Sequence, residues 1–152
     1  MRVLLLGIGN PGRRDDGLGP ALAEAIERLG IPELTVEAEY QLEAEDAAGV
    51  AEHDAVVFAD ADAAGPEPFS FGPVVPVHGL PFSSHSLEPG GVLALAQEVF
   101  GRSADAWILG IRGYDFEPLA EGLSDRAQEN LALALAFIEP MLRQKAFRPL
   151  AK

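Results

Sequence analysis

The chain has 152 residues, the usual length of one globular domain, and its hydrophobic content of 48% is enough for a buried core. Eleven Lys and Arg against 24 Asp and Glu give a formal net charge of -13, which disfavours nucleic acid as a partner because phosphates are repelled at long range. Cysteine is absent, which excludes disulfides, zinc-thiolate sites and a thiol nucleophile and fits a cytoplasmic protein. No stretch is apolar enough to span a membrane.

Apolar runs of strand length alternate with helical patterns along the chain. In chain order they predict a strand at 2–8, a helix at 17–30, a strand at 35–40, a helix at 43–53, a strand at 54–60, a helix at 90–101, a strand at 105–111 and a helix at 124–144. Ser124 is the expected N-cap of the last helix, and Pro140 should kink or end it.

Four prolines mark the segment 66–78, so a strand in its stretch FSFGPVVPVH belongs at a sheet edge. The alternation of strands and helices predicts the α/β class. We expect a single three-layer domain at residues 1–145, with a mostly parallel twisted sheet of about five strands and helices on both faces. Residues 146–152 should form a loose C-terminal tail.

The loop GIGNPGRRDDGLG, residues 7–19, allows two interpretations. Its glycines satisfy the G-x-G-x-x-G spacing of a dinucleotide site, which needs a helix that begins inside the motif. Here Pro11 removes one N–H, and the carboxylates of Asp15 and Asp16 stand where a phosphate would sit. The two aspartates could simply cap the first helix, but capping by one does not exclude a ligand role for the other.

Further polar residues occur where neighbouring parallel strands end. Asp16 follows the first strand, Asp60 ends VVFAD with Asp62 just beyond, and His85 lies in the loop before the third helix. Ligands collect at this edge of an open parallel sheet, and two carboxylates with an imidazole suit a divalent transition metal. Taken singly, such aspartates are commonly turn residues and a histidine among serines is commonly a surface residue; three on one edge favour a metal site.

Five ordered motifs carry a resemblance to a known family. The stretches are GIGNPGRRDDGLGP, YQLEAEDA, DAVVFADA, SSHSLEPGGVLALA and GYDFEPLAEGLS, and the match extends over about residues 1–142. In this order they resemble the hydrogenase maturation proteases, the endopeptidases that trim the large subunits of nickel-iron hydrogenases. The resemblance implies a compact α/β domain in which Asp16, Asp60 and His85 are the metal-ligand and catalytic positions.

The same resemblance implies an activity of the aspartic-type endopeptidase class. The substrate is a hydrogenase large-subunit precursor, whose short C-terminal extension is removed after nickel insertion. Asp16, Asp60 and His85 would engage a metal and help to polarise the scissile carbonyl or a bound water. Nickel, carried by the substrate, is the expected metal, and other divalent metals could substitute. We expect a cytoplasmic monomer with no nucleic-acid or membrane partner.

Two rival classes and one rival nucleophile stay open. GIGNPG also resembles the opening of the peptidyl-tRNA hydrolases, and a non-catalytic metal- or nucleotide-binding module is the other alternative. Ser83 and Ser84 adjoin His85, but adjacent residues rarely present nucleophile and base to each other. His78 is either a second-layer group or a surface residue at a strand end, and His53 should end the second helix.

Overall fold

The computed structural model describes residues 1–79 and 87–150, in which five strands form one sheet. The strands are β1 (Val3–Ile8), β2 (Leu34–Glu39), β3 (Ala55–Asp62), β4 (Phe69–Val74) and β5 (Asp105–Arg112). Their order across the sheet is β2-β1-β3-β5-β4, and all neighbours pair in parallel except β4, which is antiparallel to β5. The ends of β1, β2, β3 and β5 therefore meet at one border, which we call the carboxyl edge.

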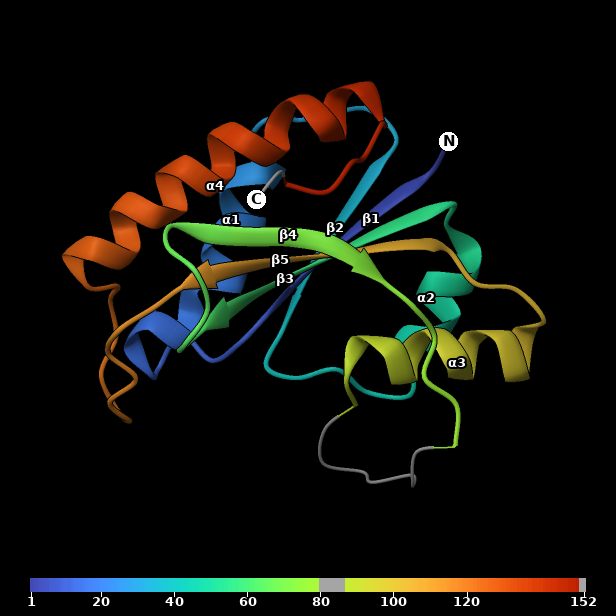
Figure 1. The fold of residues 1–152 in the computed structure, drawn as a ribbon, viewed down its shortest axis with the longest axis horizontal. Helices are drawn as coiled ribbons and strands as arrows, with labels where there is room; N and C mark the ends of the chain where they lie inside the picture. The colour runs from blue at the N-terminus through green and yellow to red at the C-terminus, as the bar shows by residue number, and fades with distance from the viewer. Residues whose placement is uncertain (80–86, 151–152) are drawn as a thin grey trace.

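Helices cover both faces of this sheet (Figure 1). They are the short 3-10 helix η1 (Arg14–Gly17) and the α-helices α1 (Leu18–Glu27), α2 (Asp46–Glu52), α3 (Pro89–Phe100) and α4 (Asp125–Gln144). Helices α1 and α4 pack on one face, whereas α2 and α3 pack on the other. The predicted three-layer α/β fold is confirmed. In the described ranges, no helix combines the length and apolar character needed to cross a bilayer.

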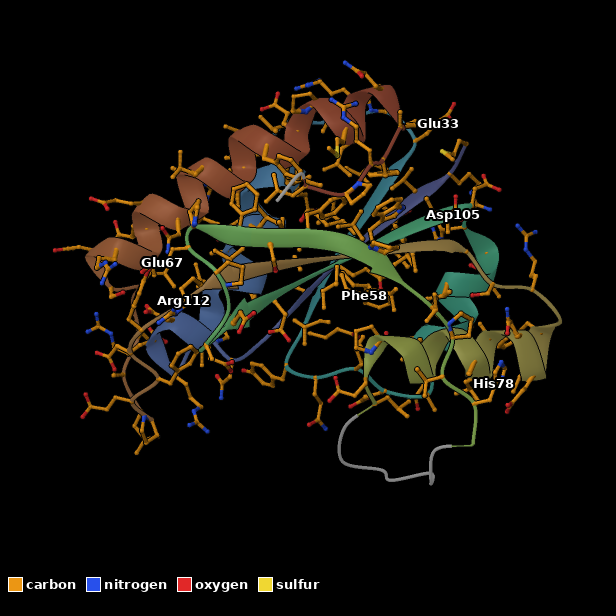
Figure 2. The ribbon with its side chains drawn as sticks, in the orientation of Figure 1. Glu33, Phe58, Glu67, His78, Asp105 and Arg112 are labelled. Atoms are coloured by element: carbon orange, nitrogen blue, oxygen red, sulfur yellow. The ribbon has the colours of Figure 1, made fainter. Side chains whose placement is uncertain are left out.

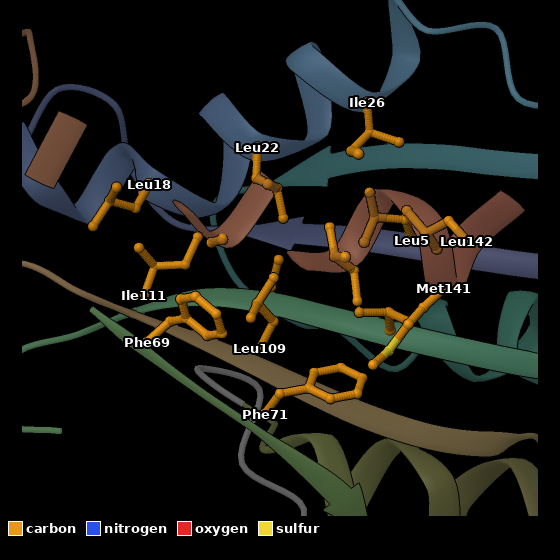
Figure 3. Close-up of a cluster of buried hydrophobic side chains, with 14 of the residues drawn as sticks. Leu5, Leu18, Leu22, Ile26, Phe69, Phe71, Leu109, Ile111, Met141 and Leu142 are labelled. Carbon is orange, nitrogen blue, oxygen red and sulfur yellow. The ribbon is translucent and has the colours of Figure 1, made fainter. Parts of the chain in front are cut away.

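The core consists of two clusters because the central strands are buried on both faces. Along β1, Val3 and Leu5 join the cluster under α1 and α4, whereas Leu4 and Leu6 join the cluster under α2 and α3. A strand buried on both sides needs apolar residues at every position, which explains the unbroken run VLLL. Figure 3 shows side chains from α1, β4, β5 and α4 meeting in the first cluster.

Proline has opposite consequences in β4 and α4. Pro73 lies in β4, at the sheet edge, where a missing N–H removes no ladder hydrogen bond, as the sequence predicted. Of the two predicted effects of Pro140, a kink or the end of the helix, the second does not occur, because α4 continues to Gln144. Beyond Pro140, Met141 and Leu142 are buried against the core, so tertiary packing offsets the hydrogen bond that proline removes.

The tail after α4 has no regular structure over residues 146–150. Its Phe147 ring nevertheless packs 6.1 Å from the ring of Trp107, centroid to centroid. The N–H of Leu150 donates to the carbonyl of Phe71 on the outer side of β4 at 3.1 Å. The described part of the tail is therefore in contact with the domain.

Candidate functional site

The first site residue is placed by the tight turn that follows β1. Gly9 has a φ of 145°, and a Cβ built there would lie 1.9 Å from the carbonyl oxygen of Asp16. Only glycine fits this close approach, which brings η1 back against the end of β1. On the neighbouring strand, Asp60 pairs in register with Ile8 at the same edge.

This packing accounts for the glycine spacing without a pyrophosphate. Helix α1 begins at Leu18, beyond the glycine motif, so its N-terminus does not lie inside that motif. Gly19, in the first turn of α1, approaches the carbonyl oxygens of Ile8 and Ala59, at 2.3 and 2.5 Å from the position of a Cβ. The glycines therefore serve contacts between chain segments.

Asp16 and Asp60 are both half-buried and each is fixed by a backbone amide. The Oδ2 of Asp16 accepts the N–H of Asn10 at 2.8 Å, and the Oδ1 of Asp60 accepts the N–H of Ala61 at 2.8 Å. Among the described residues each carboxylate accepts one hydrogen bond, which leaves further acceptor capacity. The pair can therefore take a further ligand.

Electrostatics connect the two side chains. Burial raises the pKa of Asp60 to about 7; the N–H of Ala61 opposes this shift, and the charges of Asp16, Glu88 and Asp62 reinforce it. A carboxylate surrounded by like charges is destabilised when ionised, and a cation relieves that repulsion. Perturbed carboxyl groups of this kind are typical of functional sites.

The other aspartate after β3 has a local role. The Oδ1 of Asp62 accepts the N–H of Ala64 at 3.1 Å and that of Gly65 at 2.8 Å. This is the turn-forming behaviour that is common for aspartate at a strand end. Asp62 thus contributes charge near Asp60 while its carboxylate organises the turn.

Asp15 behaves differently from its neighbour Asp16. It is fully buried and accepts hydrogen bonds from the amides of Tyr114, Asp115 and Ser124 and from the Ser124 hydroxyl. Burial acts to raise the pKa of Asp15, but these hydrogen bonds outweigh it and hold the pKa below its usual value. Neither aspartate caps a helix, because the N-cap of α1 is Gly17.

The third predicted ligand, His85, lies outside the described residues, as do Ser83 and Ser84. Within the described ranges, no group of three or more His, Asp or Glu side chains is placed to hold a metal ion. The predicted role of His85 therefore stays a prediction.

The two remaining histidines lie away from Asp16 and Asp60. His78 is exposed and its Nδ1 lies 3.1 Å from Oε1 of Glu98, as expected of a surface residue. His53 is the C-cap of α2, as predicted, and its ring contacts the carbonyl of Gly49 at 2.6 Å.

Sequence reasoning missed Glu39, at the end of β2 on the carboxyl edge. Burial, followed by the hydrogen bond and charge of Asp46, raises the pKa of Glu39 to about 8. A cavity of about 220 Å³ lies beside it, lined by Gly9, Pro11, Pro20, Ala38, Glu39 and Tyr40. Its pKa depends on the packing of α2 against β2, so no local pattern signals it.

Fold and site together define a small α/β protein with a mostly parallel sheet, whose carboxyl edge carries the interacting carboxylates of Asp16 and Asp60. No family model matches the chain, and no curated protein matches it. The chain does match several solved structures. The nickel-iron hydrogenase maturation protease HycI from Thermococcus kodakarensis is 26% identical, with 93% of this chain and 92% of that chain covered and a TM-score of 0.71.

Two further structures share the fold. The hydrogenase maturating endopeptidase HybD from E. coli is 21% identical over 99% of this chain and 97% of that chain, with a TM-score of 0.75. The maturation protease HybD from Thermococcus kodakarensis is 21% identical over 93% and 99%, with a TM-score of 0.63. The resemblance to the hydrogenase maturation protease family, predicted from the sequence motifs, is therefore confirmed.

Proposed function

We propose that this chain is an endopeptidase that removes the C-terminal extension of a nickel-iron hydrogenase large-subunit precursor after nickel insertion. Asp16, Asp60 and His85 would bind the nickel that the precursor carries, and other divalent metals could substitute. In this proposal the enzyme acts as a cytoplasmic monomer on a protein partner. Support comes from the fold that the chain shares with the maturation protease HycI and the maturating endopeptidase HybD.

The observation that carries the proposal is the electrostatic contact between Asp16 and Asp60. The Asp16 charge contributes to the raised pKa of Asp60, and the backbone carbonyl of Asp16 packs against Gly9, next to Ile8, with which Asp60 pairs in register. Such a pair has oxygen ligands ready for a cation that arrives with the substrate. Glu88, the N-cap of α3, also contributes to the raised pKa of Asp60, so the described residues that begin α3 add negative charge at this edge.

These side chains would have two tasks. Both carboxylates hold the metal-bearing region of the precursor against the carboxyl edge, which fixes the scissile bond in place. An oxygen of Asp60 that the metal leaves free would accept a proton from an attacking water. Bound metal would supply Lewis-acid polarisation of the scissile carbonyl.

The test uses the nickel-loaded precursor and a gel that separates it from the trimmed subunit. Asp16→Ala, Asp60→Ala and His85→Ala should each abolish processing, and double variants should add little because the groups act as a unit. Thermal melts should show that each variant folds. Retained processing in all three variants would exclude the proposed metal site.

Asp105→Ala is the matched control, and Asp15→Ala is not. Asp105 is exposed at the start of β5, at the opposite end of the sheet from Glu67 and Arg112 in Figure 2. Its loss changes the net charge equally without touching the carboxyl edge. By contrast, Asp15→Ala would leave several buried donors unpaired and destabilise the fold.

The rival activities separate in the same experiment. A peptidyl-tRNA hydrolase would cleave an ester on RNA and leave the precursor intact. A binding module would retain nickel or nucleotide affinity without trimming either substrate. Trimming of the precursor by the parent protein therefore distinguishes the proposed peptidase from both.

A further inference from the structure

We infer that Asp15 is a positioning residue for Asp16: its buried hydrogen bonds to the 113–124 segment aim the neighbouring carboxylate at the carboxyl edge. The inference deepens the proposed function and rests on it only where activity is measured. Asp15 itself reaches no substrate, because its side chain is fully buried.

The bonds of Asp15 span the chain. Its Oδ2 accepts the N–H of Tyr114 at 2.8 Å, the N–H of Asp115 at 3.0 Å and the hydroxyl of Ser124 at 2.7 Å. Its Oδ1 accepts the N–H of Ser124 at 2.7 Å. One carboxylate thus joins η1 to the segment after β5 and to the N-cap of α4, each about 100 residues away in sequence.

Backbone contacts reinforce this junction. The N–H of Asp15 donates to the carbonyl of Asp115 at 2.8 Å, and the N–H of Arg14 donates to the carbonyl of Ala120 at 2.9 Å. Gly113 leaves no spare room, since a Cβ there would lie 2.8 Å from Cβ of Asp15. The two segments are therefore fitted closely along their length.

The junction also holds unfavourable backbone conformations. Arg14, immediately before Asp15, has a φ of 50°, and Leu119, on the facing segment, has a φ of 61°. Residues other than glycine keep such conformations only where surrounding contacts enforce them, and they concentrate at functional sites. Here the enforcing contacts are the hydrogen bonds that Asp15 and its backbone neighbours make.

Helix geometry carries the effect from Asp15 to Asp16. Consecutive residues of a 3-10 helix point about 120° apart, so fixing the direction of Asp15 fixes that of Asp16. Asp15 faces the 113–124 segment, whereas Asp16 faces the turn after β1 and accepts the N–H of Asn10 at 2.8 Å. If the hydrogen bonds of the Asp15 carboxylate are lost, η1 can rotate, and the hydrogen bond from the Asn10 N–H to Asp16 is then lost as well.

The Asn10 amide is a reporter that does not depend on activity. In Asp15→Asn, a side chain of equal size presents an NH₂ group to backbone donors that need an acceptor. By NMR, we expect the Asn10 amide proton to lose its protection from hydrogen exchange and to change its chemical shift. The same two changes are expected in Asp16→Ala. The kcat for precursor processing should fall about tenfold to a hundredfold, with KM changed less than about twofold, as expected when a reacting group is misplaced.

Met141→Ala is the control for general loss of stability, because Met141 is buried in α4 outside these contacts. It should lower the melting temperature but leave the Asn10 amide and kcat unchanged. Ser124→Ala removes the hydroxyl that donates to Asp15 and that also accepts the N–H of Ala127 at the N-cap of α4. It should shift the Asn10 amide in the same direction by less, and it replaces Asp15→Asn if that variant does not fold.

Two results would overturn the inference: an unchanged Asn10 amide in folded Asp15→Asn, or an equal change in Met141→Ala. If the parent protein does not process the precursor while the Asn10 amide responds as expected, the positioning role stands and the proposed peptidase function fails. The two failures are therefore distinguishable.

Discussion

Two aspartates at opposite ends of β3 have opposite electrostatic environments. Asp54, just before the strand, is exposed; the N–H of Arg2 donates to its Oδ2 at 2.7 Å, and Arg102 lies 3.7 Å from its Oδ1. The hydrogen bond from Arg2, followed by the charges of the N-terminus and Arg102, lowers the pKa of Asp54. Its negative charge is compensated.

Asp60, near the other end, receives no such compensation from the residues that the structure describes. Burial and the charges of Asp16, Glu88 and Asp62 raise its pKa to about 7, against one opposing hydrogen bond. A buried carboxyl group among other negative charges does not increase the stability of the fold. The same group is suited to a site that receives a cation. The comparison supports a structural role for the amino edge, where the parallel strands begin, and the proposed ligand role for the carboxyl edge. Four predictions test this division.

The largest effect is expected at Asp60. Asp60→Asn should abolish processing of the precursor and at the same time stabilise the protein in mild alkali. Because the pKa of Asp60 is raised on folding, its stabilising contribution is present below about pH 4 and lost as the pH rises to about 7. Urea unfolding at about pH 8 should show a gain of roughly 1 to 3 kcal/mol, absent near pH 4.

Asp105→Asn is the matched control for that measurement. Asp105 is exposed at the amino edge, so neither processing nor the free energy of unfolding should change appreciably. A loss of stability in Asp60→Asn at alkaline pH would contradict the uncompensated charge at the carboxyl edge.

Asp15 should show the reverse pattern, with stability lost. Asp15→Ala leaves the half-buried amides of Tyr114, Asp115 and Ser124 without their acceptor, which should cost about 2 to 3 kcal/mol in the free energy of unfolding. Because the pKa of Asp15 is lowered, the contribution of the parent residue should disappear as the pH falls into the acidic range. Denaturant melts of Asp15→Ala and of exposed Asp125→Ala provide the check.

Nickel binding should depend on pH with a smaller effect. Binding must displace a proton from Asp60, whose pKa is about 7, so affinity should fall by about tenfold for each pH unit below neutrality. Protonation of His85, near about pH 6.5, would steepen the fall. Calorimetric titration between about pH 6 and pH 8 measures this, and a constant affinity would remove Asp60 from the proposed ligands.

The smallest effect is expected at Asp54. Asp54→Asn removes a charge that Arg2 and Arg102 compensate, so processing should continue at the parent rate and the melting temperature should fall only slightly. Added salt should reduce the difference, since it screens exposed pairs. A loss of processing here would show that the two edges are not separate in function.

Much of the fold could be predicted because it depends on local patterns. Continuous apolar runs identified the strands that are buried on both faces, and the prolines of 66–78 correctly placed a strand at the edge. Pro140 shows where this reasoning fails. Proline favours the end of a helix, but α4 continues to Gln144, because Met141 and Leu142 are buried against the core.

The site could be predicted only in part. Asp16 and Asp60 were singled out because parallel strands end at one border, and the structure does bring their charges together. Asp15 and Glu39 carry no local signal of their roles. The first depends on donors about 100 residues away, and the second on Asp46 in a packed helix.

The sequence by itself determined the order of elements, the parallel sheet and the border at which polar residues gather, since periodicity and turn chemistry act over a few residues. Only the tertiary structure decided which of two adjacent aspartates is structural and which is open to a ligand. That distinction depends on a close fit between η1 and the 113–124 segment, where one carboxylate meets four donors and its neighbour meets one. Long-range packing sets burial, and burial decides how each carboxyl group behaves.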